Sequence, residues 1–151
     1  MKKVILTLAI VLGTITLTQA QDNAIGLRLG YGGEISFQKA LGSNRLELDL
    51  GMALGYGFNL TGVYQWTWDL AALADGFKWY AGVGASVAYW NGKNGFAEDN
   101  YLNVGVAGQI GIEYNFSIPL QISLDYRPIY FFLNDGYGWY DGICLGIRYK
   151  F

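Results

Sequence analysis

After residue 21 the chain alternates between apolar and polar residues with a period of two over most of its length. In residues 45–54 one parity holds only Leu and Met, and the other holds Arg, Glu, Asp, Gly and Ala. Similar alternation recurs in residues 77–90, 101–115 and 120–132. Because successive side chains of a strand point to opposite faces, this period is typical of strands with two different environments. No segment after residue 21 shows a sustained helical period, so we predict an all-β domain.

Turn-forming residues separate the alternating runs and mark seven connections. Seven connections imply eight strands, which we place at residues 24–30, 34–40, 45–54, 58–68, 77–90, 101–115, 120–132 and 140–151. The first hairpin is the least distinct: one long strand over residues 24–40 would give seven strands, whereas an antiparallel barrel with both termini on one side needs an even number. Pro128 has no N–H to donate to a neighbouring strand, so we predict a β-bulge near Arg127 and Pro128.

The first 20 residues have the organisation of a secretory signal peptide. Lys2 and Lys3 precede a mostly apolar stretch, and the small residue Ala20 stands where a signal peptidase would cleave. An uncleaved membrane anchor is the alternative, but the stretch is shorter than the roughly 20 apolar residues that a spanning helix needs. We therefore expect a signal peptide at residues 1–20 and an exported domain at residues 21–151.

Composition removes several classes of chemistry. The chain has no histidine and a single cysteine, Cys144, which excludes intramolecular disulfides, Cys₂His₂-type zinc sites and catalytic triads that need an imidazole. Without Lys2 and Lys3, eight basic residues stand against twelve acidic ones, for a formal net charge of minus four. We expect no enzyme activity, no cofactor, no metal and no nucleic-acid partner.

Alternation alone allows two kinds of barrel, because the apolar face can line an internal cavity or face a membrane. A secreted, lipocalin-like carrier of an apolar ligand would have the first arrangement. Three features favour the second. The polar face is rich in small residues that suit a narrow interior, charged residues make up only 15% of the chain, and aromatic residues concentrate toward the strand ends on the apolar face.

The C-terminal nine residues have apolar side chains at every second position and end in an aromatic residue, Phe151. This pattern resembles the signal by which outer-membrane barrels are handed to the barrel assembly machinery, with Tyr149 and Phe151 as the candidate assembly residues. Residues 21–151 resemble the small eight-stranded outer-membrane families typified by OmpX and the OmpA transmembrane domain, and residues 119–128 are similar to a segment of small Bacteroidota barrels.

The resemblance implies an eight-stranded antiparallel up-and-down transmembrane β-barrel in the outer membrane of a Gram-negative bacterium. Its expected partners are outer-membrane lipids and the assembly machinery, and we expect a monomer. On the assigned parity, five basic and five acidic residues point inward and should pair, because an isolated buried charge is very costly. The predicted polar network of the interior contains Arg28, Glu47, Asp49, Glu113, Asp125, Arg127 and Arg148, and the other inward charges are Glu34, Arg45 and Lys78.

The possible functions depend on the polar interior of the predicted barrel and on the loops at the end opposite the termini. Glu47 and Asp49 share a strand face, which is compatible with glycoside hydrolysis, but salt-bridged interior residues are the preferred interpretation. The leading hypothesis is a non-enzymatic barrel with a structural or surface-interaction role. Alternatives are an outer-leaflet lipid-modifying enzyme that uses Ser86 or Ser123 with a carboxylate, and a narrow channel. The candidate external rim, which could instead belong to an interfacial aromatic girdle, is Phe96, Tyr137, Trp139 and Tyr140.

Overall fold

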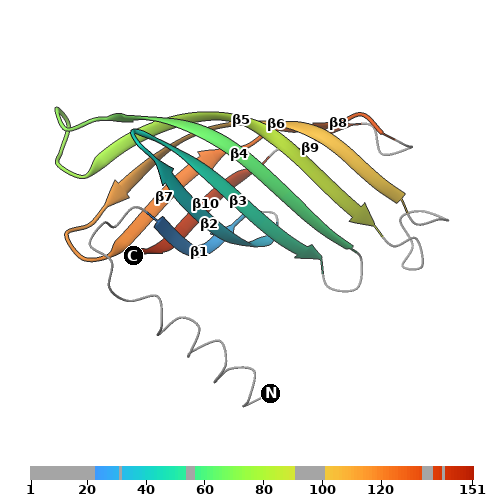
Figure 1. Cartoon of the computed structure of the whole chain (residues 1–151), viewed down its shortest axis with the longest axis horizontal. Coiled ribbons are helices and arrows are strands. Elements are labelled where there is room, and N and C mark those ends of the chain that lie inside the picture. The colour runs from blue at the N-terminus through green and yellow to red at the C-terminus, as the bar shows by residue number, and fades with distance from the viewer. Residues whose placement is uncertain (1–22, 31, 54–56, 91–100, 134–137, 141) are drawn as a thin grey trace, which may run out of the picture.

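A computed structural model describes residues 23–30, 32–53, 57–90, 101–133, 138–140 and 142–151. The described chain forms ten strand segments in one antiparallel sheet (Figure 1). The segments are β1 (Asn23–Leu29), β2 (Gly33–Leu41), β3 (Asn44–Ala53), β4 (Gly57–Asp69), β5 (Phe77–Trp90), β6 (Tyr101–Asn115), β7 (Leu120–Tyr126), β8 (Ile129–Phe131), β9 (Gly138–Tyr140) and β10 (Ile143–Lys150). The predicted signal peptide and its cleavage site lie outside the described residues, as do Phe96 and Tyr137 of the predicted rim.

The sheet closes on itself as a barrel. Consecutive strands from β1 to β7 pair with each other, and β10 pairs with both β1 and β7. β8 continues the path of β7 along β6, and β9 pairs with β8 and leads into β10, so the ten segments make eight barrel strands. This confirms the eight-stranded, antiparallel, up-and-down barrel and the two-stranded first hairpin. No helix in the described part of the chain is long and apolar enough to cross a membrane.

The strand predicted over residues 120–132 is interrupted between β7 and β8, at Arg127 and Pro128. The register with β6 is the same on both sides of the interruption, since Ile110 pairs with Tyr126 and Ala107 pairs with Ile129. A bulge would insert one extra residue and shift this register, so the predicted bulge is wrong. Gly108 N donates to Pro128 O at 2.9 Å, but Pro128 has no N–H with which to complete the pair.

The two ends of the barrel differ in their connections. The terminal end, to the left in Figure 1, holds the start of β1, the close of β10 and the turns between β2 and β3, β4 and β5, and β6 and β7. Here Phe151 N donates to Asn23 O at 2.9 Å and Asn23 N donates to Phe151 O at 3.2 Å. At the opposite end, the loop end, β1, β3, β5 and β8 finish and β2, β4, β6 and β9 begin.

Side-chain direction follows the predicted parity. In β3 the side chains of Glu47 and Asp49 are buried inside the barrel, whereas those of Leu48 and Leu50 are exposed on its outer face. The same division holds in β5, β6 and β7. The barrel therefore has a polar interior and an apolar outer surface, the reverse of a soluble globular protein.

Candidate functional site

The first group of interior charges is centred on two arginines. Arg28 Nη1 donates to Glu34 Oε2 at 2.9 Å, and the same guanidinium also pairs with Asp125. Arg127 Nη2 lies 2.6 Å from both oxygens of Glu34, and its Nη1 pairs with Asp49. Glu34 thus joins both arginines in one ionic group. Neutral donors complete it, because the Tyr80 hydroxyl donates to Asp125 Oδ2 at 3.0 Å and Asn59 Nδ2 donates to Glu34 Oε1 at 3.1 Å.

A second group surrounds Glu47, which is fully buried. Its carboxylate accepts hydrogen bonds from Arg148 Nη2 at 2.9 Å, Gln38 Nε2 at 2.5 Å and Gln109 Nε2 at 3.0 Å. The remaining nitrogens of the Arg148 guanidinium donate to two hydroxyls, Ser36 Oγ at 2.9 Å and Ser123 Oγ at 2.8 Å. The Glu47–Arg148 pair is therefore a buried ion pair whose hydrogen bonds are nearly all satisfied, which is the condition under which such a pair is tolerated.

Arg45 links the Glu47 group to the terminal end. Its Nη1 lies 2.5 Å from Glu113 Oε2, and its guanidinium carbon lies 4.6 Å from the centre of the Tyr80 ring. Arg45 Nε donates to Gln65, and Gln65 Nε2 donates to Gln109 Oε1 at 2.8 Å. A chain of hydrogen bonds therefore runs from Arg45 to Glu47.

All seven residues of the predicted polar network lie inside the barrel and form ion pairs with one another or with Glu34 and Arg45. Lys78 is different: its half-exposed side chain lies at the terminal end and pairs with Asp69 at 3.2 Å. Counting charges also missed the neutral members of the network, among them Gln38, Gln65, Gln109 and Tyr80. The alternation of the sequence predicts that these side chains point inward, but a count of charges cannot identify neutral residues.

Part of the interior is apolar. A cluster of buried residues, with the partly buried Trp90 packed against it, contains Val63, Ala88, Ala107, Ile129 and Phe131. Four of these residues come from the loop-end halves of their strands, whereas Val63 lies near the middle of β4. Both ionic and apolar side chains therefore fill the barrel, as expected for an interior only eight strands wide.

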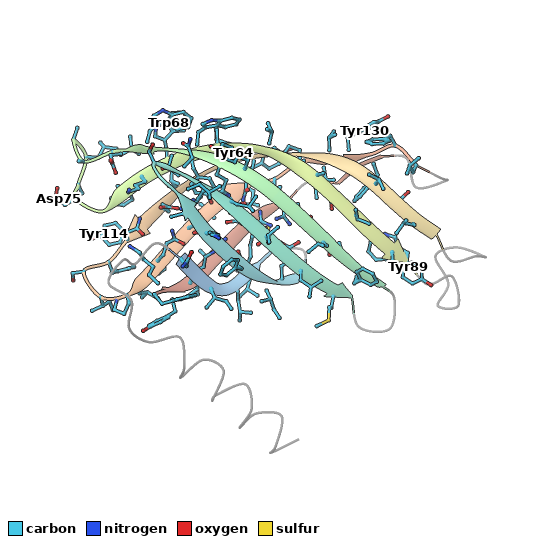
Figure 2. The ribbon with its side chains drawn as sticks, viewed as in Figure 1. Tyr64, Trp68, Asp75, Tyr89, Tyr114 and Tyr130 are labelled. Atoms are coloured by element: carbon cyan, nitrogen blue, oxygen red, sulfur yellow. The ribbon has the colours of Figure 1, made fainter. Side chains whose placement is uncertain are left out.

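The outer surface carries two levels of aromatic pairs. Trp68 and Trp79 are register partners on β4 and β5, and their rings stack 4.2 Å apart. Phe58 and Tyr89 are partners on the same two strands, ten residues away, with ring centroids 5.7 Å apart. Ten residues span about 33 Å along a strand, or roughly 25 Å along the axis of a barrel whose strands tilt by about 40°. Figure 2 shows Trp68 and Tyr89 near opposite ends of the barrel.

Between these levels the outward positions are apolar. Val83 is 57% exposed and Val106 is 55% exposed, and Leu60 and Leu124 also project outward. A carrier of an apolar ligand would need its large apolar side chains to line an internal cavity, whereas here most of them face outward and most buried side chains are polar or charged. The alternative of a lipocalin-like carrier is therefore wrong.

Comparisons with known proteins identify the fold. No protein-family model and no curated protein sequence matches the chain. Among solved structures, Neisserial surface protein A matches with a TM-score of 0.61 and 16% identity, over 85% of this chain and 93% of that one. The N-terminal β-barrel domain of Pseudomonas aeruginosa OprF matches with a TM-score of 0.63 and 13% identity, over 87% of this chain and 100% of that one. Both are eight-stranded outer-membrane β-barrels.

The fold is that of a small outer-membrane β-barrel. The similarity of residues 119–128 to Bacteroidota barrels stays a prediction.

The residues considered for catalysis form ion pairs or hydrogen bonds with other side chains inside the barrel. Glu47 and Asp49 are each paired with a different arginine. Ser86 Oγ lies 2.8 Å from Thr61 Oγ1, and Ser123 Oγ accepts from Arg148. Within the described residues neither serine is hydrogen-bonded to a carboxylate that could act as a base, and no cluster of His, Cys, Asp and Glu could hold a metal ion.

The remaining predicted sites lie at the two ends of the barrel. Trp139 and Tyr140 belong to β9 at the loop end, where their backbones pair with Tyr130 and Ile129 of β8. At the terminal end the side chain of Tyr149 is exposed on the outer face, and Phe151 is held through its backbone by the start of β1. The interaction role of the rim and the assembly role of the C-terminus stay predictions.

Proposed function

We propose that the protein is an integral outer-membrane β-barrel that catalyses no reaction and holds its loop-end surface at the outside of the cell. Its role is structural in the envelope or one of surface interaction. The observation that carries this proposal is the apolar outer surface, bounded by aromatic pairs at two levels on β4 and β5. The separation of roughly 25 Å equals the height of the apolar band of outer-membrane barrels.

Lipid is the environment that suits this surface. Soluble monomers rarely expose an apolar patch larger than a few hundred Å². Here large apolar side chains are exposed on strands all around the barrel, among them Leu27, Met52, Val83 and Ile147. A closed barrel also pairs its backbone groups between strands, which allows it to cross a region without water. Both features support contact with outer-membrane lipids.

The filled interior supports a barrier rather than a pore. Four arginines and five carboxylates are paired within it, and an apolar cluster packs beside them. The narrow-channel alternative would require a continuous water-filled path past these groups. We expect no single-channel conductance from the folded protein in planar lipid bilayers, and stepwise currents would contradict the closed interior.

In this proposal the terminal end faces the periplasm and the loop end faces outward. Export depends on residues 1–20, and insertion depends on recognition of Tyr149 and Phe151 by the barrel assembly machinery, with a monomer as the product. The position of β10 between β1 and β7 supports this order of events, because the C-terminal strand completes the barrel.

A pair of Leu/Val→Arg substitutions tests the membrane assignment. Val83 lies midway between the aromatic levels and faces outward, whereas Leu73 is 78% exposed in the β4–β5 turn beyond them. Arginine at the bilayer midplane costs about 2 to 4 kcal/mol and close to nothing outside the membrane. We expect Val83→Arg to reduce folding into lipid vesicles, measured by the mobility of unboiled samples on gels, while Leu73→Arg folds like the parent protein. Equal behaviour of the two variants, or recovery of the parent protein outside the outer-membrane fraction, would refute the proposal.

A further inference from the structure

The barrel opens at its terminal end into a polar cavity of about 310 Å³, which we call the vestibule. Every one of the eight barrel strands contributes to its wall. A cavity of this volume holds about ten water molecules at liquid density, so it has room for a small organic solute. The Arg45–Glu113 ion pair is part of its lining.

Among the described residues, the lining of the vestibule holds three cations and two anions. Three cations enter from three strands: Arg45 from β3, Lys78 from β5 and Lys150 from β10. Glu113 pairs with Arg45 at 2.5 Å, and Asp69 pairs with Lys78 at 3.2 Å. Over the described ranges Lys150 forms no ion pair, so the lining has one excess positive charge. A small monoanion would neutralise it.

The uncharged lining has its own chemical character. Five of the lining side chains are carboxamides, namely Asn23, Gln38, Asn44, Asn115 and Gln121. Gln121 is only 3% exposed, and its Oε1 has no hydrogen-bond partner among the described residues. The Nη2 group of Arg45 also lacks an acceptor there. Three of the five already donate one hydrogen within the protein, from Gln38, Asn44 and Asn115. A carboxamide nitrogen carries two hydrogens, so each keeps a second donor, which matches a solute that contains an amide.

We propose that the vestibule binds a small carboxylate that also carries an amide, of the class of N-acylated amino acids. Lys150 supplies the donor for the carboxylate, and the carboxamides that line the cavity supply partners for the amide. The site faces the aqueous phase at the terminal end, and it requires only that the barrel be folded. Failure of this inference would therefore leave the membrane assignment intact.

Two probes of nearly equal size test the inference on the folded protein in detergent. N-acetylglycine carries the carboxylate and the amide, whereas N-acetylglycinamide replaces the carboxylate with a neutral group. By isothermal titration calorimetry we expect saturable binding of N-acetylglycine. N-acetylglycinamide should bind more weakly by about tenfold or more, because it lacks the charged group that accepts the hydrogen bond. Inorganic phosphate, offered as the third probe, should bind more weakly than N-acetylglycine.

Lysine variants show whether binding occurs in the vestibule. Lys150→Gln should weaken N-acetylglycine binding by about tenfold, and Lys150→Arg should restore it. Lys39→Gln is the matched control, because Lys39 is exposed near the same end and does not line the vestibule. Gel mobility before and after boiling verifies that each variant is folded. Absence of N-acetylglycine binding, equal binding of the two N-acetyl probes, tighter binding of phosphate, or equal losses in the two Gln variants would overturn the inference.

Discussion

The Glu47–Arg148 pair offers the sharpest test of whether the barrel interior is dry and filled. Both side chains are fully buried, and Glu47 is the acceptor for three hydrogen bonds. Glu47→Leu would leave the Arg148 guanidinium with only the hydroxyls of Ser36 and Ser123 as partners. Removal of one partner from a buried pair costs about 3 to 5 kcal/mol, because the other charge stays buried without compensation.

The same reasoning predicts that a second substitution repairs part of the loss. Arg148→Met alone leaves the Glu47 carboxylate buried without its cation and should lower the free energy of unfolding by a similar amount. In the double variant no buried charge is left unpaired, and replacing a whole buried pair by apolar residues is often close to neutral. We expect the double variant to be more stable than either single variant, with a coupling free energy of at least about 2 kcal/mol.

Reversible urea unfolding in lipid vesicles, followed by tryptophan fluorescence and gel mobility, measures these free energies. Lys78→Met is the control for loss of a charge, because Lys78 pairs with Asp69 at the exposed terminal end. That change should cost no more than about 1 kcal/mol. If Glu47→Leu costs as little as Lys78→Met, and if the double variant equals the sum of the singles, water screens the interior and the barrel is not filled.

Two further predictions concern the backbone. Pro128→Val would supply an N–H opposite Gly108, so we expect the free energy of unfolding to rise by about 0.5 to 1.5 kcal/mol. The new amide should be protected in hydrogen exchange. An unprotected amide would show that the interruption has another cause. Gly84→Ala would bring a Cβ into the backbone of Gly62 and should lower the free energy of unfolding in urea by at least about 3 kcal/mol. At Gly32 an added Cβ meets nothing within 4 Å, so Gly32→Ala should change that free energy by less than about 0.5 kcal/mol. Similar values for the two glycine variants would contradict the close approach of β4 and β5.

Side-chain direction was predictable because each strand separates two very different environments. In β3 a shift of one residue would place Glu47 and Asp49 on the apolar outer face and Leu48 inside, so a single parity is compatible with the sequence. The interruption at Pro128 was predictable in position, since proline lacks a donor. Its form was not, because the unchanged register is held by the β6 pairing on both sides of the proline.

The sequence could not predict which interior charges pair with each other, because the pairing depends on the geometry of the closed barrel. Arg28 meets Asp125, 97 residues away, and Arg148 meets Glu47, 101 residues away. Such partners are fixed by the stagger of the strands, which local alternation does not reveal. Lys78 shows the same limitation: its parity is inward, but its strand begins at the barrel mouth, where Asp69 is the neighbour.

The ion pairs of β3 connect it to parts of the chain that are not its neighbours in the sheet. Arg45 pairs with Glu113 of β6, Glu47 pairs with Arg148 of β10, and Asp49 pairs with Arg127 beyond β7. In the described sheet the backbone of β3 pairs with β2 and β4 only. The pairs with Arg148 and Arg127 can form only when the C-terminal strands have closed the barrel, so this part of the ionic interior stabilises the closed state and gives little stability to an open sheet. An apolar interior would offer equal burial in many registers, whereas one basic and two acidic positions on one strand favour the single stagger that satisfies all of them.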